Sequence, residues 1–117
     1  MIRTFSAAHQ LRGYRGKCEN LHGHNYRVEV KVKAGFLNEI GLAVDFQVLK
    51  ERTDAVLDTW DHKLLNAIPP FDRINPSAEN LAAELYHRLE ASCNDLPVTL
   101  AAVTVWESDD ACATFTE

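Results

Sequence analysis

The chain has 117 residues, of which 46% are hydrophobic and 25% are charged, and its formal net charge is −5. This length suffices for one domain with one core, so we expect a single domain over residues 1–117. No apolar run approaches the roughly 18–20 residues of a membrane span. Domains that bind duplex nucleic acid usually carry a basic patch, and none stands out here. The sequence therefore disfavours both a membrane-spanning protein and a nucleic-acid partner.

The first ten residues, MIRTFSAAHQ, contain no continuous apolar region. This predicts no signal peptide and a cytoplasmic location. Cys18, Cys93 and Cys112 are odd in number and irregularly spaced, which favours free thiols over a disulfide framework. Basic residues gather in LRGYRGK, residues 11–17, and they fit either a solvated loop or a site for a small anion.

Two strands are predicted first along the chain. Residues 4–11, TFSAAHQL, alternate so that the apolar residues and His9 share one face. Residues 22–35, HGHNYRVEVKVKAG, alternate more cleanly, with charged residues on the second face. The first face of this second strand carries His22, His24, Tyr26, Val28, Val30 and Val32. The pattern is typical of a half-buried antiparallel strand.

Two helices and two more strands are predicted after these. Residues 44–66 have apolar side chains at helical spacing, with Asp45 as a plausible N-cap, and Ser77 caps a second helix over residues 78–93. The intervening IPPFDRINP breaks regular structure with its three prolines. The stretches VTLAAVTVWES and ACATFTE are strand-like.

The resulting order, β-β-α-α-β-β, predicts an α+β fold. We expect a four-stranded antiparallel sheet with both helices packed on one face. The outer strand edges would be exposed in a monomer, and self-association would cover them.

Histidines are concentrated near the start of the second strand, in CENLHGHNY, residues 18–26. His22 and His24 leave the same face because they are two residues apart on a strand. His9 lies on the apolar face of the preceding strand, so pairing of the two strands would bring three imidazoles together. Three histidines with an open fourth position suit a catalytic zinc, although ordinary polar residues are the alternative. His87, in the second helix, is interpreted as a surface residue.

Cys18 lies in a loop, four residues before His22. A nearby dication would lower the pKa of its thiol and make thiolate available for proton transfer. Two alternatives stay open: an incidental loop cysteine, or a fourth zinc ligand that would close a structural site.

Two further candidates are carboxylates. Asp61 and His62 fall at the end of the first predicted helix, where they are either an acid–base dyad or a solvated helix end. Glu107 shares a strand face with Val103 and Val105, so it either pairs with an amidine-like group or turns toward water.

Six short motifs run in order through nearly the whole chain, and together they resemble one family. They are FSAAH, CENLHGHNY, GLAVDF, DHKLLN, NPSAENLA and VTVWES. The family is that of the 6-pyruvoyl-tetrahydropterin and 6-carboxy-tetrahydropterin synthases. The Cys-x-x-x-His-Gly-His spacing of residues 18–24 resembles the bacterial 6-carboxy-tetrahydropterin synthases of queuosine (7-deazapurine) biosynthesis. The animal pyruvoyl enzymes have a longer gap.

The resemblance implies a tunnelling fold (T-fold), in which subunits join their sheets into a barrel, usually as a homohexamer of two trimers with interfacial sites. It also implies roles for single residues: His9, His22 and His24 as ligands of Zn²⁺, Cys18 as the catalytic thiolate, Asp61 and His62 as the dyad, and Glu107 as the anchor for the pterin ring. The implied reaction converts 7,8-dihydroneopterin triphosphate to 6-carboxy-5,6,7,8-tetrahydropterin, with loss of acetaldehyde and triphosphate.

One residue keeps the family branch open. Glu19 stands where a folate-making branch uses Glu in place of the Cys, and this chain has both. The alternatives are therefore a pyruvoyl synthase, an aldolase-like enzyme giving 6-hydroxymethyl-dihydropterin, or a non-catalytic module whose zinc is structural and closed by Cys18.

Overall fold

The computed structural model describes residues 1–13 and 20–117, which form one five-stranded sheet in the order β3-β1-β2-β4-β5. The strands are β1 (Ile2–His9), β2 (His22–Lys33), β3 (Lys63–Leu64), β4 (Thr99–Ser108) and β5 (Ala111–Phe115). Neighbouring strands are antiparallel except β1 and β3, which run parallel. The predicted α+β class and element order are confirmed, and the two-residue β3 is an addition that the sequence pattern did not indicate.

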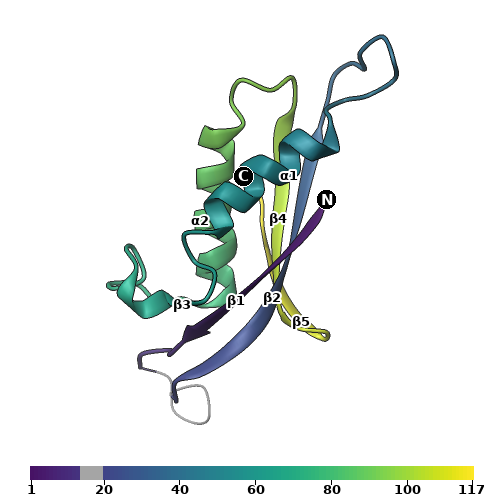
Figure 1. The fold of residues 1–117 in the computed structure, drawn as a ribbon. Coiled ribbons are helices and arrows are strands. Elements are labelled where there is room, and N and C mark those ends of the chain that lie inside the picture. Colours follow the sequence, from purple (N-terminus) through teal and green to yellow (C-terminus); the bar gives the residue numbers. More distant parts are fainter. Residues whose placement is uncertain (14–19) are drawn as a thin grey trace.

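Helices α1 (Phe46–Leu57) and α2 (Ala78–Ser92) cover one face of the sheet (Figure 1). Both predicted N-caps are confirmed. The side chain of Asp45 accepts a hydrogen bond from the N–H of Gln47, and that of Ser77 accepts one from Asn80. None of the described helices is both long enough and apolar enough to span a membrane.

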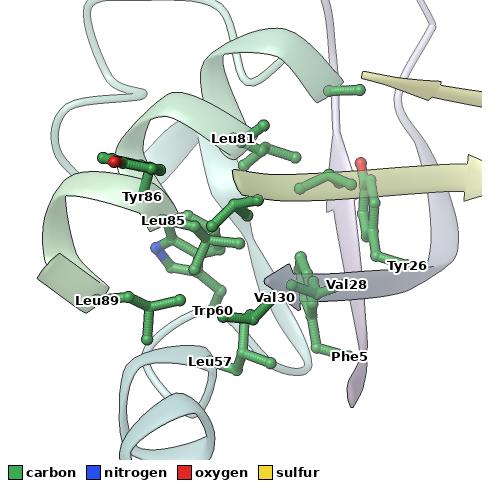
Figure 2. Close-up of a cluster of buried hydrophobic side chains, with 14 of the residues drawn as sticks. Phe5, Tyr26, Val28, Val30, Leu57, Trp60, Leu81, Leu85, Tyr86 and Leu89 are labelled. Atoms are coloured by element: carbon green, nitrogen blue, oxygen red, sulfur yellow. The ribbon is translucent and has the colours of Figure 1, made fainter. Parts of the chain in front are cut away.

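The core lies between the sheet and the helices. Leu81, Leu85 and Leu89 form the apolar stripe of α2, and they belong to one buried cluster with Val28 and Val30 of β2 (Figure 2). All five are at most 1% exposed. Burying a side chain of this size contributes about 1.5–3 kcal/mol, so this core holds α2 against β4 and β5.

The first helix ends earlier than its periodicity predicts. It stops at Leu57 instead of continuing to Asn66, and a turn follows. The reason is a set of hydrogen bonds to β1: the N–H of His62 donates to the carbonyl of Ser6 at 2.6 Å, and Asp61 Oδ1 accepts the N–H of Ser6 at 2.9 Å. Asp61 and His62 therefore lie at the edge of the sheet, and the predicted helix end was wrong.

Candidate functional site

Strand register brings three imidazoles together at one end of the sheet. His9 is the register partner of His22, and Ala7 is that of His24, so the three rings leave the same face of β1 and β2. One ring nitrogen from each histidine lies within 4.8 Å of the others. His9 is 1% exposed, whereas the other two are half-buried. The convergence predicted from the sequence pattern is present in the structure.

Two backbone carbonyls fix the tautomers of this cluster. His9 Nδ1 lies 2.7 Å from the carbonyl oxygen of Pro76, and His22 Nδ1 lies 2.7 Å from that of Asn20. A carbonyl can only accept, so each Nδ1 carries the proton, and in the neutral ring each Nε2 presents a lone pair. The two Nε2 atoms lie only 3.0 Å apart. Two lone pairs at this distance repel unless a proton or a metal ion lies between them.

The cluster fits a tetrahedral metal ion. Zinc–imidazole bonds of about 2.0–2.1 Å place ligand nitrogens about 3.3 Å apart in a tetrahedron. His24 Nε2 is buried, and no described group hydrogen-bonds to it. Burial lowers the pKa of His24, the Glu107 carboxylate opposes this shift, and the neighbouring His9 and His22 lower the pKa further. The neutral imidazole that results is the form that binds metals.

Glu107 lies at the margin of the cluster. Its Oε1 is 3.9 Å from His9 Nε2, and its side chain is 29% exposed. It also lines a pocket of about 230 Å³ together with Ser77, Glu79 and Cys112. A carboxylate placed beside a cation site and open to a pocket can bind both a positively polarised donor group and water.

An aromatic floor that the sequence analysis did not single out supports the cluster. The ring of Tyr26 stacks on Phe5 at 4.8 Å and meets the rings of His9 and His24 edge-on at 5.9 and 5.3 Å. Burial and the nearby Glu107 carboxylate raise the pKa of Tyr26, so its phenol stays protonated. The period-two pattern placed Tyr26 on the correct face, but nothing in it indicated contact with the histidines.

Asp61 and His62 form a pair of their own. Asp61 Oδ2 lies 3.0 Å from His62 Nδ1, and the His62 side chain is 81% exposed. The hydrogen bond from the N–H of Ser6, joined by the contacts with His62, lowers the pKa of Asp61. An ionised carboxylate holds Nδ1–H in place and leaves Nε2 free to take a proton.

In the described part of the protein, the dyad and the histidine cluster do not belong to one hydrogen-bond network. Among the described residues, no hydrogen bond or ion pair links Asp61 or His62 to the three histidines. His62 lines a hollow of about 530 Å³ with Ser6 and Asn25, and Ala7 and His24 also border it. Ser6 and Asn25 alternate with Ala7 and His24 along β1 and β2, so the side chains of Ser6 and Asn25 leave the face of the sheet opposite to the histidine cluster.

Known proteins resemble this chain in sequence and in fold. The family pattern described as 6-pyruvoyl tetrahydropterin synthase matches residues 1–117. The chain belongs to this family. A 6-carboxy-5,6,7,8-tetrahydropterin synthase from Synechocystis is 38% identical over 92 residues, which cover 74% of this chain and 70% of that protein. A 6-pyruvoyl tetrahydrobiopterin synthase from Dictyostelium discoideum is 39% identical over 82 residues, covering 68% and 61%.

The structural comparison agrees with the sequence comparison. The solved 6-pyruvoyl tetrahydropterin synthase of Caenorhabditis elegans superposes with a TM-score of 0.87 at 30% identity, covering 100% of this chain and 92% of that one. The fold of the present family member is therefore the tunnelling fold, as the motifs implied.

Three residues that the sequence analysis singled out are not part of the described histidine cluster or of the dyad. Cys18 and Glu19 lie outside the described residues. Arg12, from the basic stretch, donates to the carbonyls of Phe71 and Ile74 at 2.7 and 3.3 Å, so its guanidinium is engaged in holding a loop.

The remaining candidates lie away from the histidine cluster. His87 is exposed on α2, as expected, near Glu117 and Glu90. Cys93 is buried and Cys112 is exposed, and both are free thiols.

Proposed function

We propose that the protein converts 7,8-dihydroneopterin triphosphate to 6-carboxy-5,6,7,8-tetrahydropterin, releasing acetaldehyde and triphosphate, in queuosine biosynthesis. The observation that carries this proposal is the cluster of three imidazoles, with Glu107 at its margin, in a chain of the pterin synthase family. Relatives named for the carboxy and the pyruvoyl product are 38% and 39% identical, so identity does not separate the branches. The Cys-x-x-x-His-Gly-His spacing of residues 18–24 favours the carboxy branch.

His9, His22 and His24 would hold Zn²⁺ through their Nε2 atoms. Bound there, zinc would act as a Lewis acid toward substrate oxygens and acidify the neighbouring C–H bonds. The carbonyls of Pro76 and Asn20 orient two of the rings and fix their tautomers, which is the usual role of groups behind metal ligands.

Proton transfer falls to His62 and Cys18. His62 Nε2 accepts a proton because Asp61 occupies Nδ1, and the exposure of the ring lets a substrate approach it. We assign the second proton-transfer group to Cys18, in the loop before β2. The positive charge of a nearby metal would favour its thiolate.

Glu107 is proposed to anchor the pterin ring. A 2-amino-pyrimidinone presents two adjacent N–H donors, which match the two oxygens of one carboxylate. The position of Glu107, between His9 and a pocket, supports this role because the ring would then lie beside the metal.

The complete site needs more than one copy of the chain. Among the described residues, no hydrogen bond or ion pair joins Asp61 or His62 to the three histidines, and the His62 side chain is 81% exposed, so it is accessible to a second copy of the chain. We propose a homo-oligomer in which the dyad of one copy faces the cluster of the next. The hexamer of two trimers and the cytoplasmic location stay predictions.

Product identity tests the proposal. The purified protein, loaded with zinc, is incubated with 7,8-dihydroneopterin triphosphate, and the pterin product is identified by mass spectrometry. A 6-carboxy product supports the proposal. A 6-pyruvoyl or 6-hydroxymethyl product would move the protein to another branch of its family, and absence of turnover would favour a non-catalytic module.

The metal content of the Cys18→Ala variant distinguishes a catalytic zinc site from a non-catalytic zinc module. On the proposed function, this variant keeps its zinc and loses most of its activity, because a general base contributes about 10²–10⁴-fold. Loss of zinc would identify the thiol as a ligand and the site as structural.

A further inference from the structure

Ser6 connects the dyad to a third side chain. Its N–H donates to Asp61 Oδ1 at 2.9 Å, and its carbonyl accepts the N–H of His62 at 2.6 Å. Its hydroxyl donates to Asn25 Oδ1 at 2.6 Å, across the β1–β2 pair in which the two residues are register partners. Ser6 therefore fixes the Asp61 side chain, the His62 backbone and the Asn25 side chain relative to one another.

Ser6, Asn25 and His62 line the hollow of about 530 Å³, which Ala7 and His24 also border. Small residues leave room there, since Ala8 and Gly23 also line it. A methyl group built on Gly23 would meet only the carbonyl oxygen of Ala7, at 3.5 Å. The hollow thus has an open floor with polar groups from Asn25 and His62 at its wall.

The polar groups of the hollow are complementary in type. The Asn25 carbonyl oxygen is engaged by Ser6, which leaves the Nδ2 amide as a donor, and no hydrogen bond among the described residues uses it. His62 Nε2 is an acceptor when Asp61 holds Nδ1–H. A donor and an acceptor in one hollow match a hydroxyl group that is losing its proton: the acceptor takes the proton while the donor stabilises the oxygen.

We propose that Asn25 donates a hydrogen bond to an oxygen of the substrate's hydroxylated side chain beside His62, and that Ser6 is the positioning residue that aims the Asn25 amide. This inference rests on the proposed function, and it adds a substrate contact on the dyad side of the site. The contact comes from the same copy of the chain as His62.

Three variants and one control test it, with 7,8-dihydroneopterin triphosphate as substrate. Asn25→Ala removes the donor and should lower kcat/KM by about tenfold, the usual cost of one lost hydrogen bond. Asn25→Asp should lower it at least as much, because a carboxylate offers no N–H and repels a polyanionic substrate. Asn94→Asp makes the same charge change on an exposed residue after α2 and should stay within twofold of wild type.

Ser6→Ala separates positioning from a general structural effect. The backbone groups of Ser6 remain, so Asp61 and His62 keep their hydrogen bonds and the pH profile of kcat should not move. Only the aim of Asn25 is lost, so kcat/KM should fall by less than in Asn25→Ala. Zinc content and oligomeric state are measured for every variant.

Each result decides the question. If Asn25→Ala and Asn25→Asp both stay within twofold of wild type, the inference is overturned. If they lose zinc or dissociate, Ser6→Ala decides, and wild-type kinetics in Ser6→Ala overturns it. If the wild-type protein makes no pterin product, the proposed function fails and this inference falls with it, an outcome that the wild-type reaction alone identifies.

Discussion

At the scale of single residues, hydrogen bonding behind the imidazoles decides what the cluster can hold. The carbonyls of Pro76 and Asn20 accept hydrogen bonds from the Nδ1–H groups of His9 and His22, so in the neutral rings both Nε2 atoms present lone pairs, and these atoms lie 3.0 Å apart. Without a cation, this arrangement leaves two acceptors opposed and His24 Nε2 buried without a partner among the described residues. Metal binding therefore removes a destabilising feature and does not merely fill a space.

His22→Ala should abolish metal binding and turnover while the fold survives. The variant removes one of three ligands and relieves the opposed lone pairs, so the apo fold should not become less stable. Metal analysis of the purified variant and its circular dichroism spectrum check this. Retention of one zinc per chain would contradict the assignment of the ligand set.

Glu107→Gln should weaken pterin binding. Loss of a charge-assisted, two-point contact costs on the order of 1.5–3 kcal/mol, or roughly ten- to hundred-fold in affinity. The dissociation constant of sepiapterin, measured by calorimetry on zinc-loaded protein, checks this. Glu39→Gln, on an exposed loop, is the matched control and should bind as wild type. Equal affinities in the two variants would show that Glu107 does not bind the pterin ring and is only the end of a strand.

At the scale of elements, an ion pair ties α1 to the turn after α2. Arg52 donates from both terminal nitrogens to Asp95, at 2.7 and 2.9 Å, and from Nη1 to the carbonyl of Ser92 at 2.5 Å. The hydrogen bonds from Arg52 lower the pKa of Asp95 to about 2. The helices are thereby connected at the end of the molecule away from the histidine cluster.

The pH dependence of stability should report this pair. The folded pKa of Asp95 is about 2, below the unfolded value of about 3.9. The stabilisation is thus fully present above about pH 4 and is lost as the pH falls through about 2. Asp95→Asn should lower Tm at pH 7 by a few degrees, and the difference should vanish near pH 2. Asp109→Asn, an exposed change of the same kind, should show no such dependence; a constant difference would exclude the ion pair as its cause.

Local patterns predicted most elements, and contacts distant in sequence account for what they missed. Period-two alternation placed His9, His22 and His24 on one face because strand geometry alone determines side-chain direction. The end of α1 was missed because Ser6, more than fifty residues earlier, competes for the backbone of the turn. No sequence pattern indicated β3, since two residues carry no period. The partners of the histidines are backbone carbonyls, which any residue type supplies, so sequence could not indicate them.

At the scale of the whole molecule, the proposed sharing of the site between copies predicts what happens when two inactive variants are mixed. His22→Ala and His62→Ala should each be inactive alone and should recover activity when their subunits are exchanged, because a hybrid interface can join an intact cluster to an intact dyad. Random assortment would restore about a quarter of the sites. Activity after refolding the two variants together checks this.

The control mixture combines two variants that both damage the histidine cluster. His22→Ala mixed with His24→Ala should stay inactive, since every hybrid interface then lacks an intact cluster. Recovery in this control, or no recovery in the first mixture, would contradict a site shared between copies.

Strand β1 has a consequence for how this sequence can vary. Its inward residues, such as His9, lie at the cluster, and its outward residues, such as Ser6, hold the dyad. On the proposed assembly, a single strand then serves two different catalytic centres, one on each side. Most strands have a solvent-facing row in which substitutions accumulate freely. Residues 5–9 should have no such permissive row, and saturation mutagenesis with selection for turnover should find this short segment intolerant at odd and even positions alike.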